Sequence, residues 1–213
     1  GADLTIWEEA TELIHRIQNH GTLPMITSCS PGWVKFCEHQ YPQLLEHLSS
    51  CKSPQQMASA VIKTYYAEKT GIDPKNMVVV SVMPCIAKKF EIRRADQDAS
   101  GGYDTDYSIT TRELARMIKT AGINFALLPE ETFDDPLAAY TGGAVIFGAT
   151  GGVMEAAVRF AYQALEGKPL EDVNLVACRG TDLIKEATVH MGGMDVKVAI
   201  TSGGAGARIV MDK

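Results

Sequence analysis

The stretch "VVVSVMPCIAKKFE" at residues 78–91 joins a continuous apolar run to a turn with adjacent proline and cysteine, and then to a helix-like segment. The stretch "PMITSCSPGWVKF" at 24–36 repeats this order. A continuous apolar run is typical of a strand buried on both faces of a parallel sheet. Because α/β proteins hold their sites at the carboxyl ends of such strands, the two stretches predict an α/β fold with Cys29 and Cys85 near a site.

The rest of the chain alternates helical and strand patterns. The segment 5–19 has apolar residues at helical spacing, and Thr5 and Glu8 have the spacing of a capping box. A polar, glycine-containing stretch at 95–106 predicts a mobile surface loop and a lobe boundary. We expect helices over 5–19, 53–71, 110–122 and 205–212, strands over 23–27, 77–83, 174–180 and 196–204, and a strand, glycine turn and helix over 144–167.

The composition excludes two classes of partner. The 213 residues carry a formal net charge of -6, whereas a nucleic-acid surface needs clustered Lys and Arg. No stretch approaches the roughly 20 apolar residues of a membrane span. The first residues, "GADLTIWEEA", lack the features of a signal peptide, so we expect a cytoplasmic protein.

The five cysteines are an odd number without a C-x-x-C pair, which disfavours a disulfide framework and a zinc knuckle. We interpret Cys37 and Cys178, which lie within apolar patterns, as buried thiols. The glycine turns "GATGGVM" and "TSGGAGAR" have two interpretations, tight strand-to-helix packing or contact with an anion, of which packing is favoured.

Two motifs carry a resemblance to a known family. "TSCSPGW" at 27–33 and "MPCIAKKFE" at 83–91 resemble the signatures T-S-C-C-P-x-W and M-P-C-x-x-K-x-x-E of the catalytic domain of iron-only (FeFe) hydrogenases. "CKSPQQM" and "DYSITTRELARMIK" extend the resemblance along nearly the whole chain. It implies that 1–213 is a partial catalytic domain, with two α/β lobes, mostly parallel sheets and the site between the lobes.

The resemblance also implies a cofactor, the H-cluster. It consists of a 4Fe-4S cluster joined to a two-iron unit with carbon monoxide, cyanide and a bridging dithiolate amine. Cys85 would be a cluster ligand, and Ser30 stands where the family has a second ligand cysteine. Lys88 would donate hydrogen bonds to a cyanide. The residues implied to pack around the two-iron unit are Met83, Pro84, Gln55 and Phe147.

A proton path is implied in the same way. It would run from the Cys29 thiol through Ser49 and Glu12 to Glu9, with Arg16 nearby. Glu9 and Glu12 are three residues apart on one predicted helix, so their side chains can be neighbours. From the residues alone, a solvated helix face is the favoured interpretation of the pair, and an ordinary helix ion pair is the favoured interpretation of Lys88 with Glu91.

The function implied is reversible reduction of protons to dihydrogen, with ferredoxin or a nicotinamide-linked subunit as electron partner. The family's third cysteine signature is absent before Lys213, so we expect the remaining ligands to come from a missing C-terminal segment or a second chain. The substitution at Ser30 supports a rival hypothesis, a hydrogenase-like sensor, scaffold or subunit-binding domain without turnover. A thiol oxidoreductase is disfavoured because no C-x-x-C is present.

Overall fold

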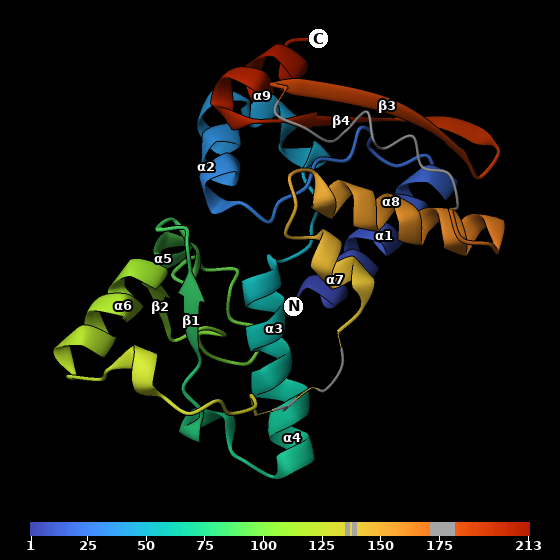
Figure 1. Cartoon of the computed structure of the whole chain (residues 1–213). Coiled ribbons are helices and arrows are strands. Elements are labelled where there is room, and N and C mark those ends of the chain that lie inside the picture. The colour runs from blue at the N-terminus through green and yellow to red at the C-terminus, as the bar shows by residue number, and fades with distance from the viewer. Residues whose placement is uncertain (135–136, 138–139, 171–181) are drawn as a thin grey trace. The chain divides into compact units, whose positions relative to one another are not determined.

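The computed structural model describes residues 1–134, 137, 140–170 and 182–213. These residues form two compact units (Figure 1). The first unit contains Gly1, Cys29–Gly32 and Lys52–Ala139, and the second contains Ala2–Ser28, Trp33–Cys51 and Tyr140–Lys213. The segment 95–106 therefore lies inside the first unit. Helices and strands together confirm the predicted α/β class.

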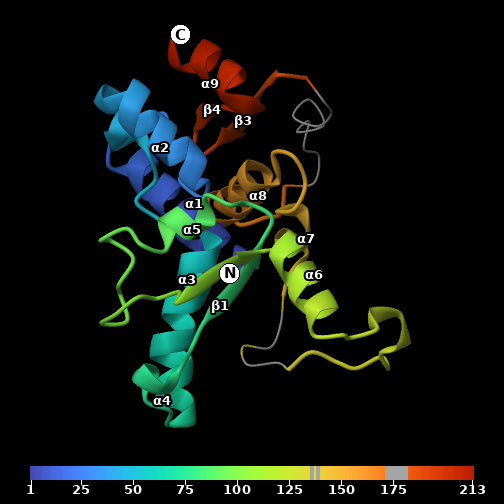
Figure 2. The same cartoon turned by 90° about the vertical axis from the view of Figure 1, so that its left-hand side faces the viewer.

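The first unit is built on two parallel strands, β1 and β2, with Val80 opposite Tyr107. A long helical segment, α3 with its π-helical continuation η2 and α4, runs beside β1 (Figure 2). Its start is confirmed, because Ser53 caps α3 and Pro54 is its first residue. The elements are α3 (Pro54–Val61), η2 (Ile62–Tyr66), α4 (Ala67–Thr70), η3 (Pro74–Asn76), β1 (Val80–Met83), α5 (Lys88–Glu91), β2 (Tyr107–Thr110), α6 (Thr111–Thr120) and η4 (Phe125–Leu127).

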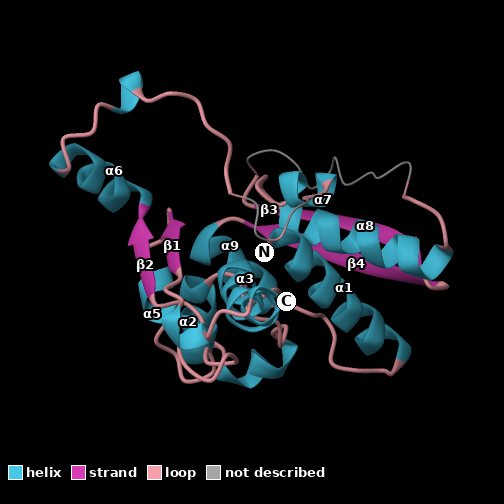
Figure 3. Cartoon of the chain, turned by 90° about the horizontal axis from the view of Figure 1, so that it is seen from below, coloured by secondary structure: helices cyan, strands magenta, loops and turns pink. Residues whose placement is uncertain are grey.

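The second unit packs α8 between α1 and an antiparallel hairpin, β3–β4 (Figures 1 and 3). Its buried core consists of Ala10, Ala157, Val158, Ala161 and Met191. Small alanines on the facing helices allow a close approach of α1 and α8. The elements are α1 (Ala2–Gln18), most of α2 (Pro31–Gln40), η1 (Pro42–His47), α7 (Gly142–Ile146), α8 (Gly152–Glu166), β3 (Ile184–Met191), β4 (Met194–Thr201) and α9 (Gly203–Met211).

Several sequence predictions need correction. The strand predicted at 23–27 is reduced to a single bridge between Ile26 and Leu48. The strand predicted after Gly143 is the helix α7, because Thr141 caps a helical turn there. The hairpin is antiparallel, so the described sheets are not mostly parallel, and β3 was not predicted. The predicted strand at 174–180, with Cys178, lies outside the described residues.

The prediction of a surface loop at 95–106 is wrong at two positions near its end. Asp104 and Thr105 are completely buried. The Asp104 carboxylate accepts hydrogen bonds from the backbone amide of Ser100 at 2.9 Å and from Lys52 Nζ at 3.2 Å. Burial alone would raise the pKa of Asp104, but these bonds outweigh it and lower the pKa. The polar composition of the loop did not indicate that Asp104 is buried and anchors the loop through these hydrogen bonds.

The glycines before α8 serve packing. Gly151 has φ of 76°, a conformation that side chains rarely adopt, and it caps α8. A Cβ on Gly152 would lie 1.8 Å from the carbonyl oxygen of Ile146. This close backbone approach supports the packing interpretation of "GATGGVM".

The capping of α6 gives a first prediction. The Thr110 hydroxyl accepts from the Glu113 amide at 3.1 Å, and Glu113 accepts from the Thr110 amide at 2.7 Å, which is a complete capping box. Thr110→Ala is expected to lower the free energy of unfolding by about 1 kcal/mol. Thr111→Ala, an exposed change one residue later, is the control. Urea denaturation measures both, and equal stability of the two variants would contradict the role of the cap.

Candidate functional site

The second unit contains a cluster of ionisable side chains on one face of α1. Glu9, Glu12 and Arg16 follow one another at helical spacing. The loop after η1, residues 48–51, lies against this face, held by the bridge between Ile26 and Leu48. The structure thus brings together the predicted relay residues Glu9, Glu12, Ser49 and Arg16 within one unit.

Glu12 is held by many donors. Its Oε1 accepts from Arg16 Nη2 at 2.7 Å, and its Oε2 accepts from Ser49 Oγ at 2.6 Å. The Ser50 amide donates to both oxygens, at 3.1 and 3.2 Å. Partial burial alone would raise the pKa of Glu12, but the bonds from Ser49, Ser50 and Arg16 outweigh it and lower the pKa. Glu12 is therefore an oriented carboxylate that stays ionised near neutral pH.

Glu9 has the opposite surroundings. Only 1% of the residue is exposed, and neither carboxylate oxygen has a hydrogen-bond partner among the described residues. The pKa of Glu9 is raised to about 7. Burial is the largest cause, the Ser28 backbone acts in the opposite direction, and the charge of Glu12 contributes to the rise. The alternative of a solvated helix face is thus wrong for Glu9. Two neighbouring carboxyl groups with separated pKa values are a typical acid–base arrangement.

Arg16 positions this cluster. Besides Glu12, its guanidinium donates to the carbonyl oxygens of Thr22 at 3.0 Å and Leu48 at 2.9 Å. These bonds tie the loop that carries Ser49 to α1. Arg16 was predicted among the catalytic residues, and its contacts are those of a positioning residue.

Cys51 is a member of this cluster that the sequence analysis missed. Its thiol lies 3.6 Å from Glu12 Oε2, and its amide donates to Ser49 Oγ at 3.1 Å. The only indication in the sequence was its position two residues after Ser49. Its contact with α1 comes from the fold.

The first unit contains a second buried polar group, centred on Lys88 and Glu91. Lys88 Nζ donates to Glu91 at 3.0 Å and to the Cys29 carbonyl at 2.9 Å. Glu91 also accepts from Ser53 Oγ at 2.9 Å and from Gln55 Nε2 at 3.3 Å. The side chains of Lys88 and Glu91 are 6% and 7% exposed. Lys88 and Glu91 thus form the helix ion pair that was the alternative interpretation, but the pair is buried. Through Lys88 it connects the turns that carry Cys29 and Cys85.

The residues predicted to hold the cofactor lie in both units. Cys29, Ser30, Gln55, Met83, Pro84, Cys85 and Lys88 belong to the first unit and Phe147 to the second. Pro84 and Cys85 are exposed. None of the four described cysteines forms a disulfide. The roles assigned to these residues from the resemblance stay predictions.

The described residues offer few donors for an iron–sulfur cluster. A 4Fe-4S cluster takes four thiolates. Over residues 1–134, 137, 140–170 and 182–213, no group of three or more His, Cys, Asp and Glu side chains is placed to hold a metal ion. Cys85 offers one thiolate, and Ser30 offers a hydroxyl, which is a harder ligand. The described residues alone therefore do not make a complete cluster site.

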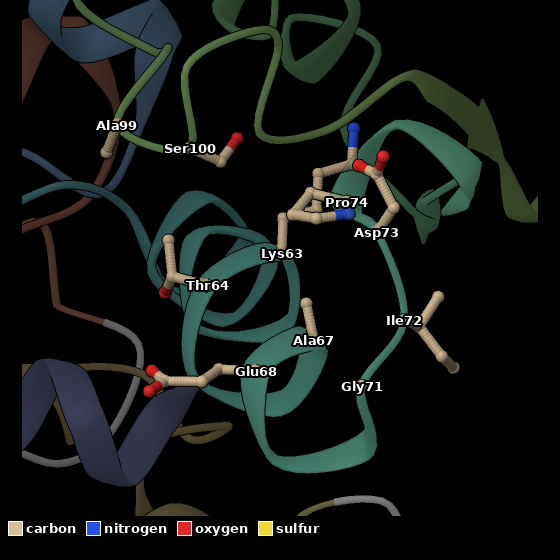
Figure 4. Close-up of a pocket in the computed structure, with 10 residues that line it drawn as sticks. All are labelled: Lys63, Thr64, Ala67, Glu68, Gly71, Ile72, Asp73, Pro74, Ala99 and Ser100. Carbon is tan, nitrogen blue, oxygen red and sulfur yellow. The ribbon is translucent and has the colours of Figure 1, made fainter.

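A pocket of about 550 Å³ lies elsewhere in the first unit, beside η2, α4 and the loop at Ala99 and Ser100 (Figure 4). Lys63 lines it, but its ammonium is already paired with Asp106 at 2.7 Å. No predicted site residue lines this pocket. The described helices include none long and apolar enough to cross a membrane.

Comparisons with known proteins agree with the motifs. The chain is 53% identical over 213 residues to the periplasmic [Fe] hydrogenase large subunit of Nitratidesulfovibrio vulgaris, covering 99% of this chain and 51% of that protein. It superposes on apo [FeFe]-hydrogenase HydA1 from Chlamydomonas reinhardtii, a cysteine-to-histidine variant, with a TM-score of 0.82 and 42% identity, covering 100% of this chain and 61% of the other. The chain thus spans about half the length of the first relative.

A more distant relative has a different name. The cytosolic Fe-S cluster assembly factor NAR1 of Sclerotinia sclerotiorum is 40% identical over 129 residues, which cover 56% of this chain and 23% of that protein. The family described as "Iron only hydrogenase large subunit, C-terminal domain" matches residues 1–213. Since the match spans the whole chain, the protein belongs to this family, the C-terminal domains of iron-only hydrogenase large subunits.

Proposed function

We propose that the chain is part of an iron-only hydrogenase that interconverts two protons and two electrons with dihydrogen. The observation that carries the proposal is the acid–base pair on α1, the buried Glu9 and the partly exposed Glu12, with Ser49 in the adjacent loop bonded to Glu12. A buried carboxyl group without partners destabilises a fold, so its presence supports a function that needs a mobile proton.

The chain's own residues supply a proton route in this proposal. Glu9, with a pKa of about 7, holds or releases a proton near neutral pH. The Ser49 hydroxyl donates to the ionised Glu12, so the direction of this hydrogen bond is defined. The proposed route contains Cys29, Glu9, Ser49 and Glu12, in which Cys29 is assigned by its motif. Glu12, whose side chain is 16% exposed, would be the member nearest solvent, and the buried Glu9 would lie inside the path and not at its end.

The proposed cofactor is the H-cluster, and it supplies the redox chemistry when bound. Cys85 would be one thiolate ligand, with Ser30 at the position of a second. The other donors would come from residues outside those described, or from a second chain. Exposed apolar side chains on β1 support such an additional segment, because Val80 and Val82 are 48% and 41% exposed although a parallel sheet is normally covered on both faces.

The proposed electron partner is ferredoxin or a nicotinamide-linked subunit, and the proposed location is the cytoplasm. The acidic net charge of -6 is compatible with electrostatic steering by a basic patch on a partner. Cell fractionation of the native host tests the location, and recovery in the periplasm would reject it.

A non-catalytic role is the second candidate. Ser30 in the position of a ligand and the similarity to an Fe-S cluster assembly factor both favour a hydrogenase-like scaffold or sensor. A scaffold, however, has no need of an unpartnered buried carboxyl group at Glu9.

The deciding experiment is dihydrogen turnover by the full-length protein, matured with its iron cofactor and purified without oxygen. Iron and sulfide analysis first establishes that the cofactor is bound. We expect turnover that disappears in Cys29→Ala and persists in Cys37→Ala, a buried thiol outside the proposed route. A loaded protein with Cys29 intact and no turnover would reject the enzyme and favour the scaffold.

A further inference from the structure

Cys51 occupies a fixed place in the second unit. Its amide donates to Ser49 Oγ at 3.1 Å, and its carbonyl oxygen accepts from Ser28 Oγ at 2.8 Å. The main chain on both sides of the side chain is therefore anchored.

The thiol is directed at the proposed relay. Cys51 Sγ lies 3.6 Å from Glu12 Oε2, the same oxygen that accepts from Ser49 Oγ at 2.6 Å. Three groups thus form a closed arrangement, in which Cys51 contacts the serine through its amide and the carboxylate through its thiol. The sulfur hydrogen bond is weak, but it acts on an ionised acceptor, which strengthens it.

The thiol is a permanent donor. The pKa of Cys51 is raised to about 12. Burial is the largest cause, the interaction with Ser49 acts in the opposite direction, and the charges of Glu12 and Glu9 contribute to the rise. At any pH at which the fold is expected to work, the proton stays on sulfur. Cys51 therefore does not carry protons along the route.

We propose that Cys51 is a positioning residue of the relay, which holds Glu12 Oε2 and Ser49 Oγ together by donating to both. This inference deepens the proposed function and rests on it for its catalytic consequence. The geometric part, that the thiol stabilises the ionised carboxylate of Glu12, is independent of hydrogen turnover.

The expected effect concerns the proton affinity of Glu12. The charged and titratable groups that face Glu12 are Arg16 and Glu9 from α1 and Cys51 from the loop, together with the neutral donors Ser49 and Ser50. Cys51→Ala removes one donor to the charged form and leaves the others. The pKa of Glu12 is therefore expected to rise by about 0.5, the equivalent of a weak hydrogen bond.

The first test uses this chain labelled with ¹³C at the glutamate carboxyl carbons. NMR titrations compare the wild type with Cys51→Ala and Cys51→Ser, and Glu12→Gln assigns the signal. We expect the upward shift in Cys51→Ala, its partial reversal in Cys51→Ser, whose hydroxyl is again a donor, and no shift in Cys37→Ala. If Cys51→Ala does not fold, Cys51→Ser and the S–H infrared band of the wild type give the readout: this band should move as Glu12 titrates.

The second test measures turnover in the full-length, cofactor-loaded protein. Cys51→Ala is expected to reduce the rate about threefold and to displace the pH profile, with recovery in Cys51→Ser. The inference is overturned, whatever the turnover, if the pKa of Glu12 is unchanged in Cys51→Ala or if the S–H band does not move as Glu12 titrates. A shifted pKa together with a wild type that is loaded but inactive supports the positioning role and rejects the proposed function.

Discussion

Replacing Lys88 by methionine is expected to lower the free energy of unfolding by about 3–5 kcal/mol. Methionine keeps most of the side-chain volume but leaves Glu91 as a buried carboxylate without its cation. The Cys29 carbonyl loses a donor as well. Because the penalty comes from an uncompensated buried charge, most of it should be recovered in Lys88→Met with Glu91→Gln, where the amide oxygen can still accept from Ser53.

The neighbouring lysine provides a matched control. Lys89 pairs with Glu113 at 2.6 Å, but the two side chains are 39% and 41% exposed. Lys89→Met is expected to cost much less than Lys88→Met, since solvent screens such pairs. Denaturant unfolding of the cofactor-free chain measures all three variants and separates this structural role from any role at a cyanide ligand. Equal losses of unfolding free energy for Lys88→Met and Lys89→Met would contradict the structural role of the buried Lys88–Glu91 pair.

Replacing Glu9 by glutamine is expected to change the pH dependence of stability. The pKa of Glu9 is raised in the fold from 4.5 to about 7, so between these values the native state binds more protons than the unfolded state. The contribution of this carboxyl group to the free energy of unfolding is therefore fully present below pH 4.5. It is lost as the pH rises to 7, and the loss is about 3 kcal/mol in total. Glu9→Gln removes this loss.

The comparison between variants isolates this contribution, because other groups titrate in the same range. The difference in unfolding free energy between Glu9→Gln and the wild type should grow in favour of the variant from pH 4.5 to 7. Glu8→Gln, an exposed change on the same helix, should leave the pH dependence unaltered. A constant difference for Glu9→Gln across this range would show that the carboxyl titrates normally.

The same variant tests the proposed relay. In the full-length, loaded protein, Glu9→Gln is expected to lower dihydrogen turnover by a factor of about 10² to 10⁴, the usual contribution of a positioned acid or base. Glu8→Gln should retain turnover. Full activity in Glu9→Gln, with iron content unchanged, would remove Glu9 from the route and leave its pH-dependent stability effect standing.

Local patterns predicted the helices well and the strands less well. The helix after Ser53 and the capping box at Thr110 depend on contacts within four residues, which are visible in the sequence. The strand predicted at 23–27 failed, since a strand needs a partner that only the fold can place. The helix α1 begins at Ala2, and Thr5 is a buried interior residue and not the predicted cap.

The motifs around Cys29 and Cys85 determined the family, because long signatures depend only on the order of residues. Which of the two glutamates would titrate near neutral pH was decided by tertiary structure. Glu9 and Glu12 are the same residue type on the same helix, but the loop at 48–51 provides hydrogen-bond donors to Glu12 and none to Glu9. The same loop placed Cys51 against Glu12. Burial and hydrogen-bond partners separated by nearly forty residues set these proton affinities, and such contacts exist only once the chain has folded.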